Sequence, residues 1–167
     1  MGDGIEEIYL KYRDNIYNYL YQLSLNKHTA EELTQDTFIK VFKYFNSFKA
    51  QSNVRTWLYK IARNTYLDHI KKNCLYNEET IEGNDLVEKN DDYKSLNEKI
   101  VINEILNNLR ETERTLILLR DLYGFSYVEI SSVIGLPLGQ IKIGIYRARK
   151  KFKQLYYNEC GVLRDWN

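Results

Sequence analysis

The chain has 167 residues, of which 44% are apolar and 28% are charged, and its 24 basic and 23 acidic side chains give a net charge of +1. This length fits one ordinary domain or two small ones, and no apolar run is long enough for a membrane span. The single proline argues against a β protein, which normally needs more turn residues, so the composition predicts an all-α fold.

The N-terminus and the two cysteines bear on where the protein acts. The N-terminal segment MGDGIEE is acidic and lacks the pattern of a signal peptide. Cys74 and Cys160 belong to no CxxC motif, so we expect neither a disulfide framework nor a cysteine zinc site. Lone thiols in an unexported chain predict a reducing compartment, the cytoplasm, with no membrane insertion.

In the N-terminal part, apolar residues that recur with helical period predict three helices. The first spans 5–23, the second runs from a capping box at Thr29 and Glu32 to about Phe48, and the third spans 54–72. The second helix places acids next to phenylalanines. That combination suggests a face that docks on another protein, and the alternative is an ordinary amphipathic core helix.

The third predicted helix separates its charges from its apolar residues. The side predicted to face the core includes Trp57, Leu58, Ile61 and Ala62, and the far side includes Lys60, Arg63 and Asn64. With the polar loop 46–53 before it, this helix could hold extruded single-stranded bases by stacking and by neutralising the backbone. The alternative is that its aromatic residues belong to the core.

Residues 73–94, NCLYNEETIEGNDLVEKNDDYK, show no apolar periodicity and are rich in Asn, Asp and Glu. We interpret them as a flexible acidic linker between two helical domains, 1–72 and 95–167. Net charge supports this division, because residues 55–72 carry five bases and one acid and residues 137–167 carry seven bases and two acids. The alternative is a long surface loop within one domain.

Beyond this segment, helices are predicted near 95–108, 112–122, 126–134 and 137–156. Capping boxes start the first and the third of them, at Ser95 and Ser126. Gly135 can adopt the left-handed conformation that ends the third helix, and Pro137 suits the first position of the fourth. A short helix, a glycine turn and a second helix form a helix-turn-helix.

The last predicted helix has an apolar side and a cationic side. Ile141, Ile145 and Ala148 share the packing side, and residues 137–153 contain six bases and no acid. Such a surface is expected of a helix in a DNA groove, and the alternative is a solvated basic face. The predicted base readers are Gln140, Lys142, Ile143, Tyr146 and Arg147, and the predicted phosphate contacts are Arg149, Lys150, Lys151 and Lys153.

Two blocks of this sequence resemble bacterial RNA polymerase sigma factors of the extracytoplasmic-function group. AEELTQDTFIKVFKYFNSF (30–48) with VRTWLYKIARNTYLDHIKK (54–72) is similar to the second conserved region of that family. LRETERTLILLRDLYGFSYVEISSVIGLPLGQIKIGIYRARKKF (109–152) is similar to the fourth. The resemblance implies an alternative sigma factor that binds core RNA polymerase, directs it to promoters and nucleates melting, without enzymatic activity, cofactor or metal.

The resemblance also implies partners and residue roles. Docking on the clamp helices of the largest polymerase subunit is implied for Glu32, Gln35, Asp36, Phe38 and Phe42. Melting and reading of the minus-ten element is implied for Asn46, Phe48, Asn53, Arg55, Trp57, Lys60, Arg63 and Asn64. Reading of the minus-thirty-five element is implied for Gln140, Lys142, Ile143, Tyr146, Arg147, Arg149 and Lys150. The implied partners are core polymerase (its clamp helices and flap), promoter DNA and an anti-sigma factor.

The predicted recognition helix departs from the family pattern. Ile143-Gly144 stands where the family usually has Ser-Arg, and Gln140 stands where it usually has Thr. A mid-helix glycine costs about 1 kcal/mol of helix propensity, and the missing arginine removes a phosphate contact. These departures bear on which minus-thirty-five sequence is read and not on DNA binding itself.

Two other classes of protein were weighed. A stand-alone helix-turn-helix regulator would explain residues 109–155 but would leave 30–72 as mere scaffold. A nuclease would need a paired-carboxylate metal site, for which Glu31, Glu32 and Asp36 are the only close acids on a helix of the first domain.

Overall fold

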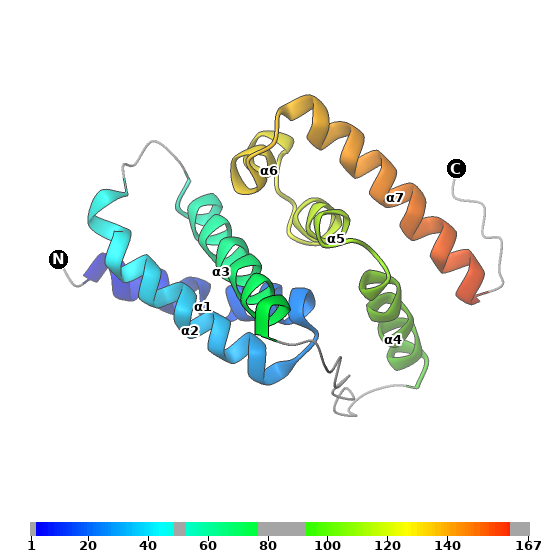
Figure 1. The fold of residues 1–167 in the computed structure, drawn as a ribbon, viewed down its shortest axis with the longest axis horizontal. Coiled ribbons are helices and arrows are strands. Elements are labelled where there is room, and N and C mark those ends of the chain that lie inside the picture. Colours follow the sequence, from blue (N-terminus) through cyan, green and yellow to red (C-terminus); the bar gives the residue numbers. More distant parts are fainter. Residues whose placement is uncertain (1–2, 49–52, 77–92, 161–167) are drawn as a thin grey trace. The chain divides into compact units, whose positions relative to one another are not determined.

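The computed structural model describes residues 3–48, 53–76 and 93–160, and their regular structure is entirely helical (Figure 1). The elements are α1 (Asp3–Ser24), α2 (Lys27–Tyr44), η1 (Phe45–Ser47), α3 (Val54–Tyr76), α4 (Tyr93–Asn107), α5 (Glu111–Ile117), η2 (Leu118–Leu122), α6 (Tyr127–Ile134) and α7 (Leu138–Cys160). The prediction of an all-α fold is confirmed. The contacts divide the chain into two compact units, the first built on α1, α2 and α3 and the second on α4, α5 and α7.

Most of the predicted linker, residues 77–92, lies outside the described residues. At its two ends, α3 continues to Tyr76 and α4 begins at Tyr93. Among the described helices, none is by itself long and apolar enough to cross a membrane, and only α6 and α7 together, across a bend of 99°, reach that threshold.

The core of the first unit is rich in tyrosine. The rings of Tyr19 and Tyr59, both buried, lie 5.0 Å apart between centroids. Burial raises the pKa of Tyr59 to about 12, so its hydroxyl stays protonated at neutral pH. Tyr66 donates a hydrogen bond to the carbonyl of Leu23 at 2.8 Å, which ties α3 to the end of α1. Tyrosine can therefore fill this core while its polar tip is satisfied.

The buried face of α3 overlaps only part of the predicted one. Leu58 and Ala62 are buried as predicted, together with Tyr59, whereas Trp57 and Ile61 are only half-buried. The buried face is rotated from the predicted one toward the tyrosines, which the predicted apolar side did not include. With them included, the buried arc also takes in Arg63, which is 7% exposed and not on the far side of the helix.

The ends of the helices follow the sequence only in part. The Asn26 side chain accepts a hydrogen bond from the backbone N–H of Thr29 at 2.9 Å and caps α2, so the predicted capping box at Thr29 is wrong. The box at Ser126 and Glu129 is confirmed by reciprocal hydrogen bonds of 2.8 and 3.2 Å. Gly135 has a φ of 81°, the left-handed conformation expected after α6.

The second unit contains a π turn that the sequence does not predict. Instead of one helix over 112–122, α5 ends at Ile117 and η2 follows, with the Tyr123 N–H donating to the Leu118 carbonyl at 2.9 Å. Such a turn takes up one residue more than an α-helical turn and rotates the residues beyond it. It lies in the part of the unit that packs against α7, where Ile141, Ile145 and Ala148 are buried as predicted.

Candidate functional site

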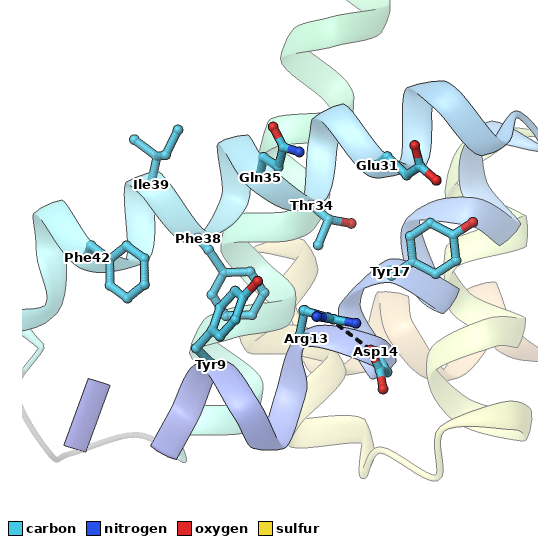
Figure 2. A pocket seen from close by; sticks show the side chains of 10 residues that line it. All are labelled: Tyr9, Arg13, Asp14, Tyr17, Glu31, Thr34, Gln35, Phe38, Ile39 and Phe42. Atoms are coloured by element: carbon cyan, nitrogen blue, oxygen red, sulfur yellow. Dashed lines mark hydrogen bonds and ion pairs between the residues drawn. The ribbon is translucent and has the colours of Figure 1, made fainter. Parts of the chain in front are cut away.

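A groove of about 890 Å³ lies along α1 and α2 in the first unit (Figure 2). Its aromatic floor is formed by Tyr9 and Phe38, whose rings meet edge to face with centroids 4.9 Å apart. Ile39 is 62% exposed and Phe42 is 44% exposed at one end of this groove. The lining residues are Tyr9, Arg13, Asp14, Tyr17, Glu31, Thr34, Gln35, Phe38, Ile39 and Phe42.

Three of the five predicted docking residues, Gln35, Phe38 and Phe42, line this groove. Phe38 is buried and lies 6.5 Å from Phe42 between ring centroids, so it supports the exposed ring instead of offering surface itself. Glu32 and Asp36 are exposed on α2 outside the lining.

The half of the groove that belongs to α1 was missed by the sequence analysis. Tyr9 and Tyr17 both line the groove, although the sequence assigns them no binding role (Figure 2). Arg13 also lines it and is ion-paired with Asp14 at 3.1 Å. Burial and the nearby Glu31 raise the pKa of Tyr17. The signal that could have found them is the width of the aromatic stripe, which exceeds what one packing face needs.

A second candidate surface surrounds the start of α3. Phe48 and Trp57 are half-buried, and their rings lie 4.7 Å apart between centroids. The Asn53 side-chain oxygen accepts a hydrogen bond from the Arg55 backbone N–H at 3.0 Å, which uses that oxygen to start the helix. The Arg55 guanidinium lies 5.8 Å from the centre of the Tyr59 ring. Of the four remaining predicted residues, Arg63 is buried and the others are exposed, namely Asn46, Lys60 and Asn64.

The third candidate surface is the outer side of α7. Most of the predicted contacts are exposed there, namely Gln140, Lys142, Ile143, Tyr146, Arg147, Arg149 and Lys150. The structure nevertheless brings two of the predicted phosphate contacts to acids of the same unit. Arg149 donates two hydrogen bonds to the Asp121 carboxylate, one of them 3.0 Å from Nε to Oδ2, and Lys151 Nζ lies 2.8 Å from Glu113 Oε2.

These ion pairs shift the pKa values of Arg149 and Glu113, which both belong to the second unit. The hydrogen bond to Asp121 raises the pKa of Arg149. Burial alone would raise the pKa of Glu113, but hydrogen bonds from Lys151 and from the Arg110 backbone N–H outweigh burial and lower it. Both pairs therefore favour the charged forms and fix α7 against the elements before it.

Gly144 lies where α7 approaches α5. A Cβ at this position would come within 2.8 Å of Leu116 Cδ1, closer than such atoms pack. The glycine that departs from the family pattern therefore has a structural reason, because it allows the two helices to lie close together.

The three surfaces offer an apolar groove, a pair of aromatic rings tilted by 34° to each other and a cationic helix. Among the described residues, no group of three or more His, Cys, Asp or Glu side chains is arranged to hold a metal ion.

Comparisons with known proteins match both parts of the chain. Residues 8–74 match the family model of sigma-70 region 2, and residues 100–152 match that of sigma-70 region 4. The chain is 30% identical over 158 residues to RNA polymerase sigma factor YlaC of Bacillus subtilis, with 91% of each protein covered. It is 29% identical over 158 residues to the ECF RNA polymerase sigma factor SigM of the same organism, covering 91% of this chain and 94% of that one.

A solved structure shares the fold. The sigma factor RpoE from Bartonella quintana, in complex with the anti-sigma factor NepR, aligns with a TM-score of 0.76 and 26% identity, covering 98% of this chain and 100% of that chain. Fold and sequence together define an RNA polymerase sigma factor with regions 2 and 4.

The chain belongs to the sigma-70 family, in its extracytoplasmic-function group, as its sequence predicted. It is an alternative sigma factor, which directs RNA polymerase to promoters, and not a stand-alone regulator.

Proposed function

We propose that this sigma factor docks on core polymerase through the α1–α2 groove and the adjacent outer side of α2. The observation that carries this proposal is the exposure of Ile39 and Phe42 at an open groove of about 890 Å³, next to the exposed acids Glu32 and Asp36. Apolar surface rimmed by charge is characteristic of protein-binding sites. The clamp helices of the largest subunit are the proposed occupant, as the family resemblance implies.

In the same proposal, the surface at the start of α3 captures flipped minus-ten bases and α7 reads the minus-thirty-five element. Phe48 and Trp57 supply rings for stacking, and exposed Lys60 neutralises the backbone. On α7 the contacts are made by the exposed residues of its outer side, with Arg149 held by Asp121 as a support. Arg63 is buried and so offers little surface to DNA.

In this proposal, each predicted domain has its own binding role. Residues 1–72 bind the polymerase and the minus-ten element, residues 95–167 bind the minus-thirty-five element, and residues 73–94 join them. The protein acts by binding in the cytoplasm, without a catalytic step of its own. Because the similar RpoE was solved with the anti-sigma factor NepR, we also propose that an anti-sigma factor covers these faces.

Run-off transcription with purified core polymerase and a promoter library tests the proposed function. We expect initiation at a defined position that requires the full chain. Asp36→Arg should abolish co-elution with core polymerase while circular dichroism stays unchanged, because the side chain is exposed. Glu7→Arg makes the same charge change at an exposed position outside the groove lining and should co-elute normally. Tight, specific duplex binding without polymerase, and no initiation with it, would contradict the proposal.

A further inference from the structure

Ile143 lies at the centre of the outward face of α7. With a helical step of about 100° per residue, it lies roughly 200° from the buried Ile141. Its side chain is 53% exposed, and that of Tyr146, one turn further along, is 68% exposed. The two side chains therefore form an apolar pair on the side of the recognition helix that faces away from its own unit.

Folding gives no reason for isoleucine at this position. A β-branched side chain loses rotamer freedom in a helix, and an exposed one regains little by burial. One turn before it, Gly139 has no side chain, and a Cβ there would meet nothing within 4 Å. Of the two helical neighbours on the N-terminal side of Ile143, only Gln140 therefore carries a side chain, which leaves room beside Ile143 for a flat group to approach.

The surroundings of this apolar pair are cationic. Lys142, Arg147 and Lys150 are exposed around it, and residues 137–153 contain no acid. A ring of cations with an apolar centre matches the major groove of DNA, where phosphates border the bases and the thymine C5-methyl is the apolar group on display. The early position of Ile143 in the helix is also where recognition helices meet base edges.

We propose that Ile143, together with Tyr146, contacts the C5-methyl group of thymine in the minus-thirty-five element, and that this contact sets the base preference there. The inference rests on the proposed role of α7 in reading that element. In this chain, the contact with the thymine methyl group would discriminate between bases. In the usual family pattern, the polar side chains of the Ser-Arg pair would do so.

The test uses holoenzyme assembled from the full chain and core polymerase, with a promoter first selected from a library randomised at the minus-thirty-five element. We expect thymine at one or two adjacent positions of the selected element. Replacing such a thymine by deoxyuridine removes only the methyl group and should weaken promoter binding about four-fold, the equivalent of one buried methyl. Fluorescence anisotropy on otherwise identical duplexes measures this ratio.

Variants of the chain assign the effect to one side chain. Ile143→Ala should bind the thymine and deoxyuridine promoters equally, whereas the conservative Ile143→Val should keep most of the discrimination. Leu122→Ala is the matched control, because Leu122 is 56% exposed but lies in η2 and not in α7. That variant should discriminate as well as the unmodified chain.

The outcomes separate this inference from the proposed function. If the holoenzyme initiates at the selected promoter but does not distinguish thymine from deoxyuridine, or if Ile143→Ala still distinguishes them, the methyl contact is refuted and the proposed function stands. If the holoenzyme selects no promoter, both are refuted.

Discussion

Both units expose apolar side chains, but the charges nearby differ. On α2, Ile39 and Phe42 have Lys40 and Lys43 beside them and follow a run of carboxylates at Glu31, Glu32 and Asp36. On α7, Ile143 and Tyr146 lie among cations, with no acid in residues 137–153. Apolar exposure alone marks a binding surface, and the charges around it then indicate its partner. A border of both signs suits a protein surface, and a purely cationic one suits phosphates.

The largest expected effect is a loss of binding to core polymerase when a charge is placed in the apolar groove. Phe42→Asp places a charge on the exposed end of the groove and should weaken binding to core polymerase by about 100-fold, because an interface then buries an unpaired carboxylate. Leu10→Asp, at an exposed position of α1 outside the lining, is the control. Equal affinities of the two variants for core polymerase would show that the groove is not the docking site.

A smaller effect on promoter binding should distinguish two arginines of α7, Arg147 and Arg149. Arg147 is exposed, and its removal in Arg147→Ala should lower holoenzyme affinity for the promoter about ten-fold and reduce the salt slope by about one. Arg149→Ala removes the partner of Asp121 and should leave that slope nearly unchanged while lowering thermal stability. Binding measured over a range of salt concentrations checks both, and equal slopes for the two variants would contradict the distinction.

Replacing either of two glycines of α7 by alanine should change the free energy of unfolding, but in opposite directions. Gly139→Ala meets nothing within 4 Å and should stabilise the fold by up to about 1 kcal/mol through helix propensity. Gly144→Ala meets Leu116 at 2.8 Å, and the cost of overpacking should exceed that gain, for a net loss of about 1 kcal/mol. Urea unfolding of the full chain followed by circular dichroism measures both. Stabilisation by both alanines would mean that Leu116 moves aside freely.

The smallest effect is the pH dependence of the Glu113–Lys151 pair. Because the pKa of Glu113 lies below its usual value of 4.5 in the folded chain, its contribution to stability is complete above that pH and is lost as the pH falls through the folded pKa. Glu113→Gln should therefore lower the melting temperature slightly at pH 7, and this difference should shrink as the pH falls below 4.5. A difference between the variants that stays constant over this range would refute the assignment.

Local patterns predicted well what depends on neighbouring residues. The buried side of α7 and the capping box at Ser126 follow from residues at most a few helical turns apart, and both are confirmed. The phase of α3 was predicted only in part, because its apolar side was taken without Tyr59 and Tyr66, although the Leu23 carbonyl satisfies the Tyr66 hydroxyl from 43 positions away.

The candidate site was predicted least well where it joins distant segments. The groove is lined by residues of both α1 and α2, and the sequence of neither helix alone predicts how the two pack together. Asp121 reaches Arg149 across 28 positions, and Glu113 reaches Lys151 across 38. The first of these pairs also depends on the π turn, which no periodic pattern indicates.

Two adjacent residues of that π turn hold two different helices, α6 and α7, in place. The Arg120 guanidinium donates to the Phe125 carbonyl at 2.8 Å and lies 4.7 Å from the centre of the Tyr127 ring, at the start of α6, whereas Asp121 holds α7 through Arg149. The residues that position α7 are thus distinct from those on its outward side. If α7 reads the minus-thirty-five element as proposed, exchanging its outward residues should retarget the factor to new promoters while its scaffold is kept, whereas deleting one residue from the turn should misalign every such redesign.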